Sequence, residues 1–538
     1  MEGIDQPEIS SLPLGVELPS LAVVQDPAIG NINPRTGEPL EPVPFSSEQE
    51  VFWAVDRCRV AFKEWGSTAF DDRANLVTEM VEAIVKRREE VMSVIAMETG
   101  RHETDILGSE LAGLIDYCRS AIKVAQRALR HEQVAASPLK YLTQKTIGVE
   151  AVPRGVIGII GSWNYPLATF FRSLFPALLS GNTVVLKPSE YAPRTGGWLA
   201  SVAQEVLPRD VVTVVQGDPK IADSLFSAGI DAIAFSGTVE TGERIHQLAA
   251  EHMIPSSLEL SGRDSAIVLA DCDLERTVSG IARYALGHSG QGDGSVEKVY
   301  VEASIADQFV KSLVKLVTKL RVGTEQFNEF DIGPLQSSAQ VVRALEHIDE
   351  AIQQGAKLRC GGRRVGRGFS ILPTVLDHCK ENMKLIEREI LGPVVCILRV
   401  NSGEEALQRA NSSPYGLNGS VWTEDLQKGQ ALARRMNVGV AMVNNHSISS
   451  AMAEIPWGGS KRSGTNTLGS RHAYQNYVKY KTLMVDHSRW PEAFWYPIDK
   501  DLKKFLEFKL ELASGAFHRA GALVNLLRKR VKTIRRLL

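Results

Sequence analysis

Short apolar runs that end in small residues alternate with segments of helical length, and this alternation limits the fold more than any other feature of the chain. Four such runs, rich in Val and Ile, occupy residues 155–162, 182–189, 211–217 and 232–237. Strands this apolar are buried on both faces, which is typical of a parallel sheet covered by crossover helices. We therefore predict an α/β fold in which ligands bind at the carboxyl ends of the strands.

A second alternating region follows between residues 264 and 445, with apolar runs at 265–270, 297–303, 393–400, 418–423 and 438–445. The region before the first sheet, residues 47–135, has helical spacing instead, and it opens with Ser47 and an acid-rich turn that suits a helix cap. The chain thus predicts two α/β lobes with a cleft between them.

Length and composition set broad limits. A chain of 538 residues with 44% apolar and 23% charged residues is that of an ordinary globular protein of two or three lobes. A net charge of −2 gives no reason to expect nucleic acid as a partner. The six cysteines are scattered without a CxxC pair, so neither a metal site nor a disulfide framework is expected. With no signal peptide and no apolar run of spanning length, we expect a cytoplasmic protein.

Three local patterns suggest chemistry, and each has a plainer interpretation. Residues 234–250 read as a strand, a turn containing glycine and a helix start, which suits a phosphate group but is also a common structural turn. Lys187 and Glu190 follow an apolar strand, where a carboxylate binds ribose hydroxyls in dinucleotide folds, or forms a surface pair. Glu259 lies between two leucines, where apolar surroundings favour a general base, unless it is an exposed edge residue.

Seven ordered motifs resemble those of the NAD(P)-dependent aldehyde dehydrogenase superfamily over roughly residues 25–490. The resemblance implies an α/β fold with a Rossmann-like dinucleotide domain, an α/β catalytic domain and a small β oligomerisation element. The matching segments are GSWNYP at 161–166, LKPSE at 186–190, FSGTVETG at 235–242, LEL around Glu259, GQ at 290–291, EILGPV at 389–394 and PWGGSKRSG at 456–464.

The same resemblance implies roles for individual residues. Asn164 would help to hold the oxyanion of a tetrahedral intermediate, and Glu259 would activate the water that hydrolyses the acyl intermediate. The residues expected to bind NAD are Trp163, Lys187, Glu190, Ser236, Gly237, Thr238, Gly242 and Glu389. Lys187 and Glu190 would hold the adenosine ribose, the turn at 236–238 would meet the pyrophosphate, and Glu389 would hold the nicotinamide ribose. The carboxylate of Glu190 favours NAD over NADP without excluding NADP.

The pattern departs from the family at its centre. The family's Gly-Gln-x-Cys places the nucleophilic cysteine at position 293, where this chain has Asp293. A carboxylate is a poor nucleophile towards an aldehyde, and its acyl product would be a reactive anhydride. Ser261, Leu391 and Pro219 also replace the family's usual Gly, Phe and Gly.

Two hypotheses follow. The protein either keeps NAD binding without the usual oxidation, or it oxidises an aldehyde hydrate with Asp293 and Glu259. In the second case the two carboxyls would share a tunnel and one of them would be protonated.

The resemblance also sets the expected organisation. We expect an N-terminal arm at 1–45, a dinucleotide-binding domain at 46–135 and 153–262, a catalytic domain at 263–445, an oligomerisation element at 136–152 and 473–487, and a C-terminal extension at 488–538. The family implies a homodimer or homotetramer, with a small-molecule aldehyde as substrate if the protein is active.

Residues 519–538 contain seven basic side chains and no acid. At helical spacing, one face would carry Leu523, Leu527, Val531, Ile534 and Leu538, and the other Arg528, Lys529, Lys532, Arg535 and Arg536, with Arg530 breaking the division. Such a helix suits the surface of an anionic membrane. It would equally suit packing on a partner subunit or on the protein's own core.

Overall fold

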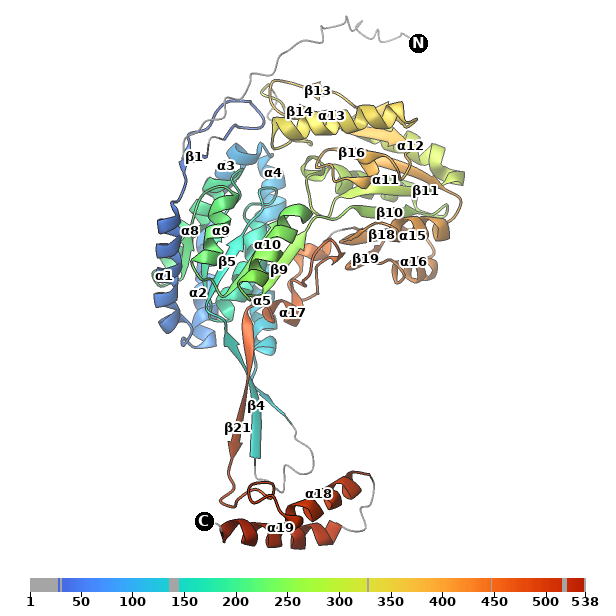
Figure 1. Ribbon diagram of the computed structural model, residues 1–538. Helices are drawn as coiled ribbons and strands as arrows, with labels where there is room; N and C mark the ends of the chain where they lie inside the picture. The colour runs from blue at the N-terminus through green and yellow to red at the C-terminus, as the bar shows by residue number, and fades with distance from the viewer. Residues whose placement is uncertain are drawn as a thin grey trace, which may run out of the picture.

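The computed structural model describes residues 28–29, 31–134, 145–326, 329–446, 448–514 and 520–536. Two α/β lobes lie side by side, and a narrow β arm extends from the body to a pair of helices at the C-terminal end (Figure 1). Most of the expected N-terminal arm falls outside the described residues. Its described part contains the antiparallel pair β1 (Ala28–Ile29) and β2 (Val43–Pro44).

The first lobe is built on a five-stranded parallel sheet in the order β7-β6-β5-β8-β9. The strands are β5 (Val156–Ile160), β6 (Thr183–Lys187), β7 (Val212–Val214), β8 (Ala232–Gly237) and β9 (Ser256–Leu260). The four apolar runs described above form β5 to β8. Their side chains are buried on both faces, as the lack of polar alternation predicts.

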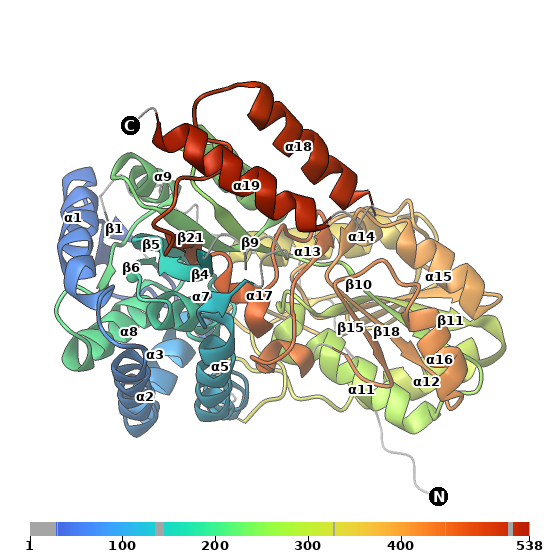
Figure 2. The same ribbon diagram turned by 90° about the horizontal axis from the view of Figure 1, so that it is seen from below.

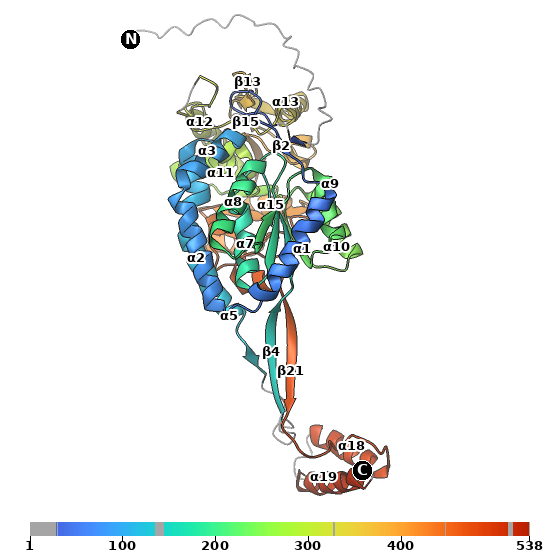
Figure 3. The ribbon, with the colours of Figure 1, turned by 90° about the vertical axis from the view of Figure 1, so that its left-hand side faces the viewer.

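Helices cover both faces of this sheet (Figure 3). One apolar core contains residues of α1 (Glu48–Trp65), α9 (Pro219–Ser227) and α10 (Val239–Glu251). The other contains residues of α2 (Phe70–Lys86), α3 (Arg88–Thr99), α5 (Leu114–Ala128), α7 (Ala168–Leu179) and α8 (Pro193–Val206). The Ser47 cap is present: its hydroxyl accepts from the Glu50 amide while the Glu50 carboxylate accepts from the Ser47 amide.

The second lobe is built on a seven-stranded mixed sheet in the order β12-β15-β16-β11-β10-β18-β19. Only the edge pair β12–β15 is antiparallel. The strands are β10 (Asp264–Val268), β11 (Val296–Glu302), β12 (Lys357–Cys360), β15 (Thr374–Asp377), β16 (Val394–Val400), β18 (Asn418–Trp422) and β19 (Val440–Val443).

Its two apolar cores lie on opposite faces of that sheet. One core contains α11 (Leu274–Leu286) and α12 (Ala303–Val317), and the other contains α13 (Ser338–Gln353), α15 (Gly403–Asn411) and α16 (Leu426–Ala433). Short elements complete the lobe: β13 (Arg364–Val365), β14 (Ser370–Ile371), α14 (Lys384–Glu387), β17 (Tyr415–Gly416) and β20 (Ser460–Lys461). The later helix α17 (Ser470–Tyr474) returns to the first lobe, where it packs in the core with α5 and α7.

The arm is a three-stranded antiparallel sheet in the order β21-β4-β3. It pairs β4 (Lys145–Pro153) with β21 (Val478–Asp486), and β3 (Glu132–Gln133) adds a short third strand. The expected oligomerisation element at 136–152 falls partly outside the described residues. Its second expected part, 473–487, begins in α17 and the turn after it, so the extended structure starts only at Val478.

Two helices, α18 (Lys500–Ala513) and α19 (Ala520–Arg535), pack against each other at the end of the arm (Figure 2). Ala493, Leu502 and Phe505 form a small core with Leu526 and Leu527. Of the apolar face predicted for α19, Ile534 is buried and Leu527 and Val531 are half-buried, whereas Leu538 and the side chain of Leu523 lie outside the described residues. The five residues of the predicted basic face are exposed.

Arg530, which breaks the pattern of that helix, is fully buried. Its guanidinium donates to the Ala493 carbonyl at 2.7 Å and to the Asp499 carboxylate at 2.9 Å, and so ties α19 to the loop before α18. Arg530, the residue that breaks the amphipathic pattern, is therefore the one that holds α19 against the loop before α18. None of the helices that the structure describes is both long and apolar enough to cross a membrane.

Candidate active site

The ends of three neighbouring strands bring most of the expected site residues to one cavity. Asn164 follows β5, Thr238 follows β8 and Glu259 lies near the end of β9. The cavity is lined by Ser162, Trp163, Asn164, Ser236, Gly237, Thr238, Glu259, Ser261, Asp293, Glu389 and Leu391. This is the cleft between the lobes, because Glu389 and Leu391 come from the segment before β16 in the second lobe.

The remaining expected residues lie outside this lining. Lys187 ends β6, and its ammonium is 3.7 Å from the Glu190 carboxylate. Burial lowers the pKa of Lys187, and the neighbouring Glu190 opposes that shift. Gly242 packs inside α10 against Leu260, whose side-chain carbon would lie 2.3 Å from an added Cβ. Its position therefore gives Gly242 a packing role between α10 and β9.

The loop before Asp293 holds an unusual backbone conformation. His288 and Ser289 have φ of 50° and 58°, and Gly290 has φ of 70°. Each non-glycine residue held in this region costs about 1–3 kcal/mol, and such strain gathers at functional sites. A Cβ at Gly290 would lie 2.1 Å from the Gly392 carbonyl oxygen, so only glycine fits there.

Gln291 anchors the same loop. Its side-chain amide donates to the Pro334 carbonyl at 3.2 Å, and its side-chain oxygen accepts from the Gln336 amide at 2.9 Å. The Gly-Gln pair in the sequence thus has a structural reason. It fixes the position from which the residue at 293 points into the cavity.

The carboxylate of Asp293 is held by Asn164. The Asn164 side-chain amide donates to Asp293 Oδ1 at 2.7 Å and to the Gln291 carbonyl at 3.0 Å. In the resemblance this amide is the donor that would stabilise an oxyanion. Here it is already engaged by a carboxylate of the protein.

Arg172 on α7 was not identified from the sequence, and it changes the electrostatics of the site. Its guanidinium donates to the Glu259 carboxylate and lies 3.9 Å from the Asp293 carboxylate. It also stacks over the Trp457 ring, 4.7 Å from the ring centroid. The expectation that Glu259 has only apolar neighbours is therefore wrong. A cation between the two carboxylates also removes the reason for them to share a proton.

A larger cavity, of about 310 Å³, is also lined by Asp293, the residue that the two cavities share. Arg172, Asp293, Tyr165, Tyr284, Arg283 and Trp457 are among its lining residues. Burial raises the pKa of Tyr165 to about 12, so its hydroxyl stays protonated at neutral pH. A molecule in this cavity would contact Asp293, which also lines the first cavity.

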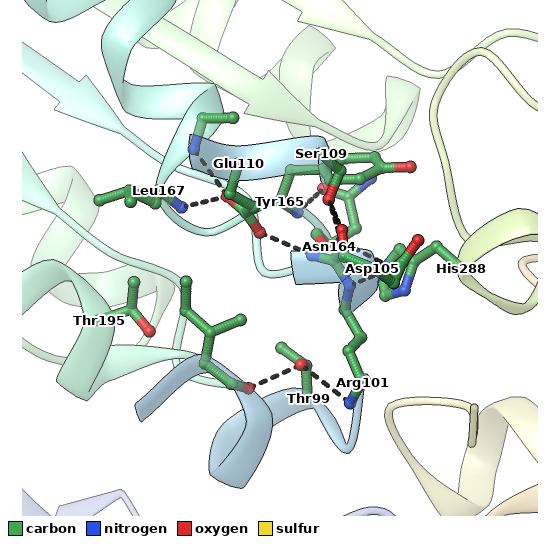
Figure 4. Close-up of polar contacts among 12 residues, drawn as sticks. Thr99, Arg101, Asp105, Ser109, Glu110, Asn164, Tyr165, Leu167, Thr195 and His288 are labelled. Atoms are coloured by element: carbon green, nitrogen blue, oxygen red, sulfur yellow. Dashed lines mark hydrogen bonds and ion pairs between the residues drawn. The ribbon is translucent and has the colours of Figure 1, made fainter. Parts of the chain in front are cut away.

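A buried polar network supports Asn164 from behind (Figure 4). Arg101, beyond α3, bonds Glu110 at 2.6 Å and Asp105 at 2.9 Å, and it donates to the Asn164 carbonyl at 3.3 Å. Glu110 in turn accepts from the amides of Leu167 and Ala168 at 3.1 and 2.8 Å, at the start of α7. Asp105 lies in α4 (Glu103–Ile106), and Glu110 lies in the π-helical turn η1 (Leu107–Leu111).

Electrostatics around Glu389 are also unusual. Burial of its carboxyl and the nearby Glu297 carboxylate raise the pKa of Glu389 to about 8. Among the residues that the structure describes, no three His, Cys, Asp or Glu side chains cluster as metal ligands do. The arrangement is thus one of carboxylates around a cleft at strand ends, with Arg172 paired to Glu259 and Asn164 bonded to Asp293.

These residues fit a dinucleotide. The amides at the start of α10, the Lys187–Glu190 pair after β6 and the Glu389 carboxyl of the second lobe would supply a phosphate site and two ribose acceptors. A dinucleotide would carry reducing equivalents to and from a substrate that reaches Asp293 through the larger cavity.

Comparison with known proteins agrees with this geometry. The sequence profile described as the aldehyde dehydrogenase family matches residues 23–483. The chain is 31% identical over 486 residues to 4,4'-diapolycopene aldehyde oxidase of a Methylomonas species, covering 89% of this chain and 91% of the relative.

Solved structures agree as well. A Mycobacterium tuberculosis aldehyde dehydrogenase complexed with NAD+ superposes with a TM-score of 0.80 at 32% identity, covering 86% of this chain and 95% of that one. An NAD+ complex of a Bacillus cereus aldehyde dehydrogenase superposes with a TM-score of 0.81 at 29% identity, covering 86% and 94%. Sequence, fold and the arrangement of the cleft lead to one assignment: this chain belongs to the aldehyde dehydrogenase family.

Proposed function

We propose that this protein is a non-catalytic member of the family that binds NAD and oligomerises, with Asp293 at the position of the nucleophile. The observation that carries the proposal is the hydrogen bond from Asn164 to the Asp293 carboxylate, 2.7 Å long. The group that would stabilise a developing oxyanion is thereby engaged by a permanent anion of the protein.

The chemistry of the family needs a thiolate. A thiolate adds to the aldehyde carbon, the adduct gives hydride to NAD+, and water hydrolyses the thioester to acid and thiol. Of the described residues that line the two cavities, none is a cysteine. Glu259, the expected base, is paired with Arg172, which makes its carboxylate a weaker proton acceptor.

Retention of NAD binding has separate support. The residues expected to hold the adenosine half, Lys187 and Glu190, are both present at the end of β6, where their side chains form an ion pair. The Glu190 carboxylate would repel a 2′-phosphate, so we propose NAD rather than NADP as the ligand. The solved relatives described above are themselves NAD+ complexes.

The test is NADH formation by the purified protein with short, long and aromatic aldehydes, beside NAD binding followed by calorimetry. We expect binding without turnover, because loss of a covalent nucleophile lowers kcat by about 10⁶ in a hydrolase where this has been measured. Asp293→Cys should gain hydride transfer. A natural protein that turns over and loses this activity in Asp293→Ala would contradict the proposal.

That outcome would favour the alternative function, an active NAD(P)-dependent oxidoreductase. In it, Asp293 or Glu259 would take the proton of an aldehyde hydrate while the hydrate carbon gives hydride to the cofactor. Both carboxylates face the cleft, which is the observation in its favour. The Arg172 contact opposes it, because a paired carboxylate is the weaker base.

We further propose that the arm forms a homodimer or homotetramer. Strand β21 is the edge of its sheet, and it exposes Tyr480, Leu483, Met484 and Val485. An exposed apolar edge strand is a surface that proteins normally cover. Light scattering of the purified chain tests this directly.

We propose peripheral membrane contact for residues 519–538, through the exposed basic face of α19. The loop before α18 adds Trp490, Phe494, Trp495 and Tyr496, each more than half exposed. Aromatic and basic side chains together are typical of proteins that rest at an anionic bilayer surface. Sedimentation with anionic and with neutral vesicles separates this contact from protein assembly.

A further inference from the structure

The cavity between the strand ends and Glu389 has an uneven charge. Three of its lining residues are carboxylates, namely Glu259, Asp293 and Glu389, and none of its lining residues is Lys or Arg. Arg172 contacts two of them, Glu259 and Asp293, but it lines the larger cavity and not this one. A ligand group that enters the smaller cavity therefore meets acidic side chains and neutral hydrogen-bonding groups.

The three carboxylates differ in how far their charge is compensated. Glu259 is directly paired with Arg172. Asp293 is held by a neutral amide donor, and the Arg172 guanidinium stands 3.9 Å away, beyond hydrogen-bond length. Arg172 brings one positive charge to the two carboxylates of Glu259 and Asp293, so these three side chains together leave one net negative charge beside the cavity.

Oxidised and reduced NAD differ in the charge of the nicotinamide ring, and carboxylates in this cavity would respond to that charge. The nicotinamide ring of NAD+ carries a positive charge and that of NADH is neutral, while the adenosine, ribose and pyrophosphate parts are the same. The residues expected to hold the adenosine ribose and the pyrophosphate lie at the ends of β6 and β8, so the nicotinamide half would be the part nearer Glu389 and Asp293.

We propose that the protein distinguishes the two oxidation states of the cofactor, and that Asp293 makes it bind NAD+ more tightly than NADH. The inference rests on the proposed NAD binding and specifies its ligand. Two unit charges about 8 Å apart at an effective dielectric of 20 change an equilibrium constant by about thirtyfold. A tenfold preference for NAD+ is the expected minimum.

The side chain at position 293 would then select between the oxidation states of the cofactor, where the family's cysteine acts as a nucleophile. A thiol there is neutral when protonated and treats both oxidation states alike, whereas a carboxylate is a permanent counter-ion for the oxidised ring. No electron or proton transfer is involved, so the protein would report the oxidation state of the NAD pool through occupancy alone.

The test is calorimetric titration of the full chain with NAD+, NADH and ADP-ribose, which lacks the nicotinamide ring. The expected result is at least tenfold tighter binding of NAD+ than of NADH. Asp293→Asn keeps the size of the side chain and an oxygen acceptor for Asn164, and it should reduce the ratio to less than about threefold. ADP-ribose affinity should stay within twofold of the natural protein, which also shows that the variant is folded.

The matched control is Asp349→Asn, which removes an exposed carboxylate on α13 and should leave all three affinities unchanged. Equal affinities of the natural protein for NAD+ and NADH would overturn the inference, and so would an unchanged ratio in Asp293→Asn. Failure to bind NAD+ and ADP-ribose alike would instead refute the proposed NAD binding itself.

Discussion

At the scale of single residues, the site departs from the family's pattern in more than the side chain at position 293, because the contacts of two other expected catalytic residues differ as well. Asp293 occupies the donor of Asn164, and Arg172 occupies the carboxylate of Glu259. In the family's reaction, Asn164 would act before hydride transfer, on the tetrahedral intermediate, and Glu259 would act after it, on the hydrolytic water. The two contacts therefore engage the groups of both stages. Restoring a thiol at 293 therefore frees Asn164 and leaves Glu259 paired.

This separation predicts different outcomes for single and double variants. Asp293→Cys should give a burst of about one NADH per subunit followed by slow turnover, because the thioester forms and its hydrolysis lacks a free base. Adding Arg172→Met, which keeps the volume and removes the charge, should raise the steady-state rate by about 10²-fold. Stopped-flow absorbance of NADH resolves the two phases.

The Arg172→Met single variant is the control and should remain inactive, because it has no nucleophile. Equal steady-state rates in Asp293→Cys and the double variant would show that the Arg172–Glu259 contact does not limit hydrolysis.

Glu389 predicts a pH dependence of binding. Its pKa of about 8 means that the carboxyl is protonated at pH 7 and ionises as the pH rises. The groups that act on it are Glu297 and Asp293, which raise the pKa, and Ser261 and Arg263, which lower it. A cationic nicotinamide ring prefers the ionised form, so NAD+ affinity should rise about tenfold from pH 6.5 to 9 while NADH affinity stays nearly constant.

Calorimetry across that range checks the expectation, and Glu389→Gln should flatten the profile. Lys298 is the competing explanation, because burial lowers the pKa of its ammonium to about 8 as well. A slope that persists in Glu389→Gln would assign the titration to Lys298 rather than to Glu389.

At the scale of elements, the Asn164 segment depends on the buried Arg101–Glu110 ion pair, which joins the region after α3 to η1 and whose carboxylate accepts from the amides at the start of α7. The side chains of Arg101 and Glu110 are 2% and 0% exposed, and burial disfavours the charge on Glu110 unless Arg101 remains. Arg101→Met should lower the free energy of unfolding of the first lobe by about 3–5 kcal/mol, because it leaves a buried charge without its partner.

Urea unfolding followed by tryptophan fluorescence measures this change. Arg435→Met is the control, since the Arg435–Glu404 pair is 57% and 63% exposed and its loss should hardly change the unfolding curve. A similar small effect in both variants would mean that the network is not needed to hold α7 and Asn164.

The elements themselves follow closely from the sequence, and the side-chain partners do not. Runs of Val and Ile without polar alternation specified β5 to β8, and the strand ends placed Asn164, Thr238 and Glu259 together. Arg172 was missed, although it left a signal: it is the one charged side chain in α7, whose other residues are apolar or small. A charge in a buried helix needs a partner, but the sequence does not show that tertiary packing brings Arg172 to Glu259, 87 residues further along the chain.

At the scale of the whole molecule, the arm carries its exposed apolar surface away from the cofactor cleft (Figure 1). If β21 is covered by another subunit, charges on it should separate the subunits. Leu483→Lys combined with Met484→Lys should shift the mass measured by light scattering to that of a monomer, with NAD+ affinity unchanged. Tyr496→Lys, on the loop before α18, serves as a control for added charge outside the strand.

The helix pair α18 and α19 contains none of the residues expected to bind the cofactor. Its removal tests whether cofactor binding in the cleft and membrane contact at the helix pair are independent. Arg530 closes α19 onto the loop before α18, so residues 488–538 form a unit with its own small core. A chain that ends at residue 487 keeps β21 and every expected cofactor residue. It should retain its assembly and bind NAD+ within about threefold of the full chain.

The same truncation removes the exposed basic face of α19. Sedimentation with anionic vesicles should therefore disappear, while sedimentation with neutral vesicles should be low for both chains. Retained vesicle binding would place the membrane contact elsewhere, and a loss of assembly would assign the helix pair to the subunit interface instead.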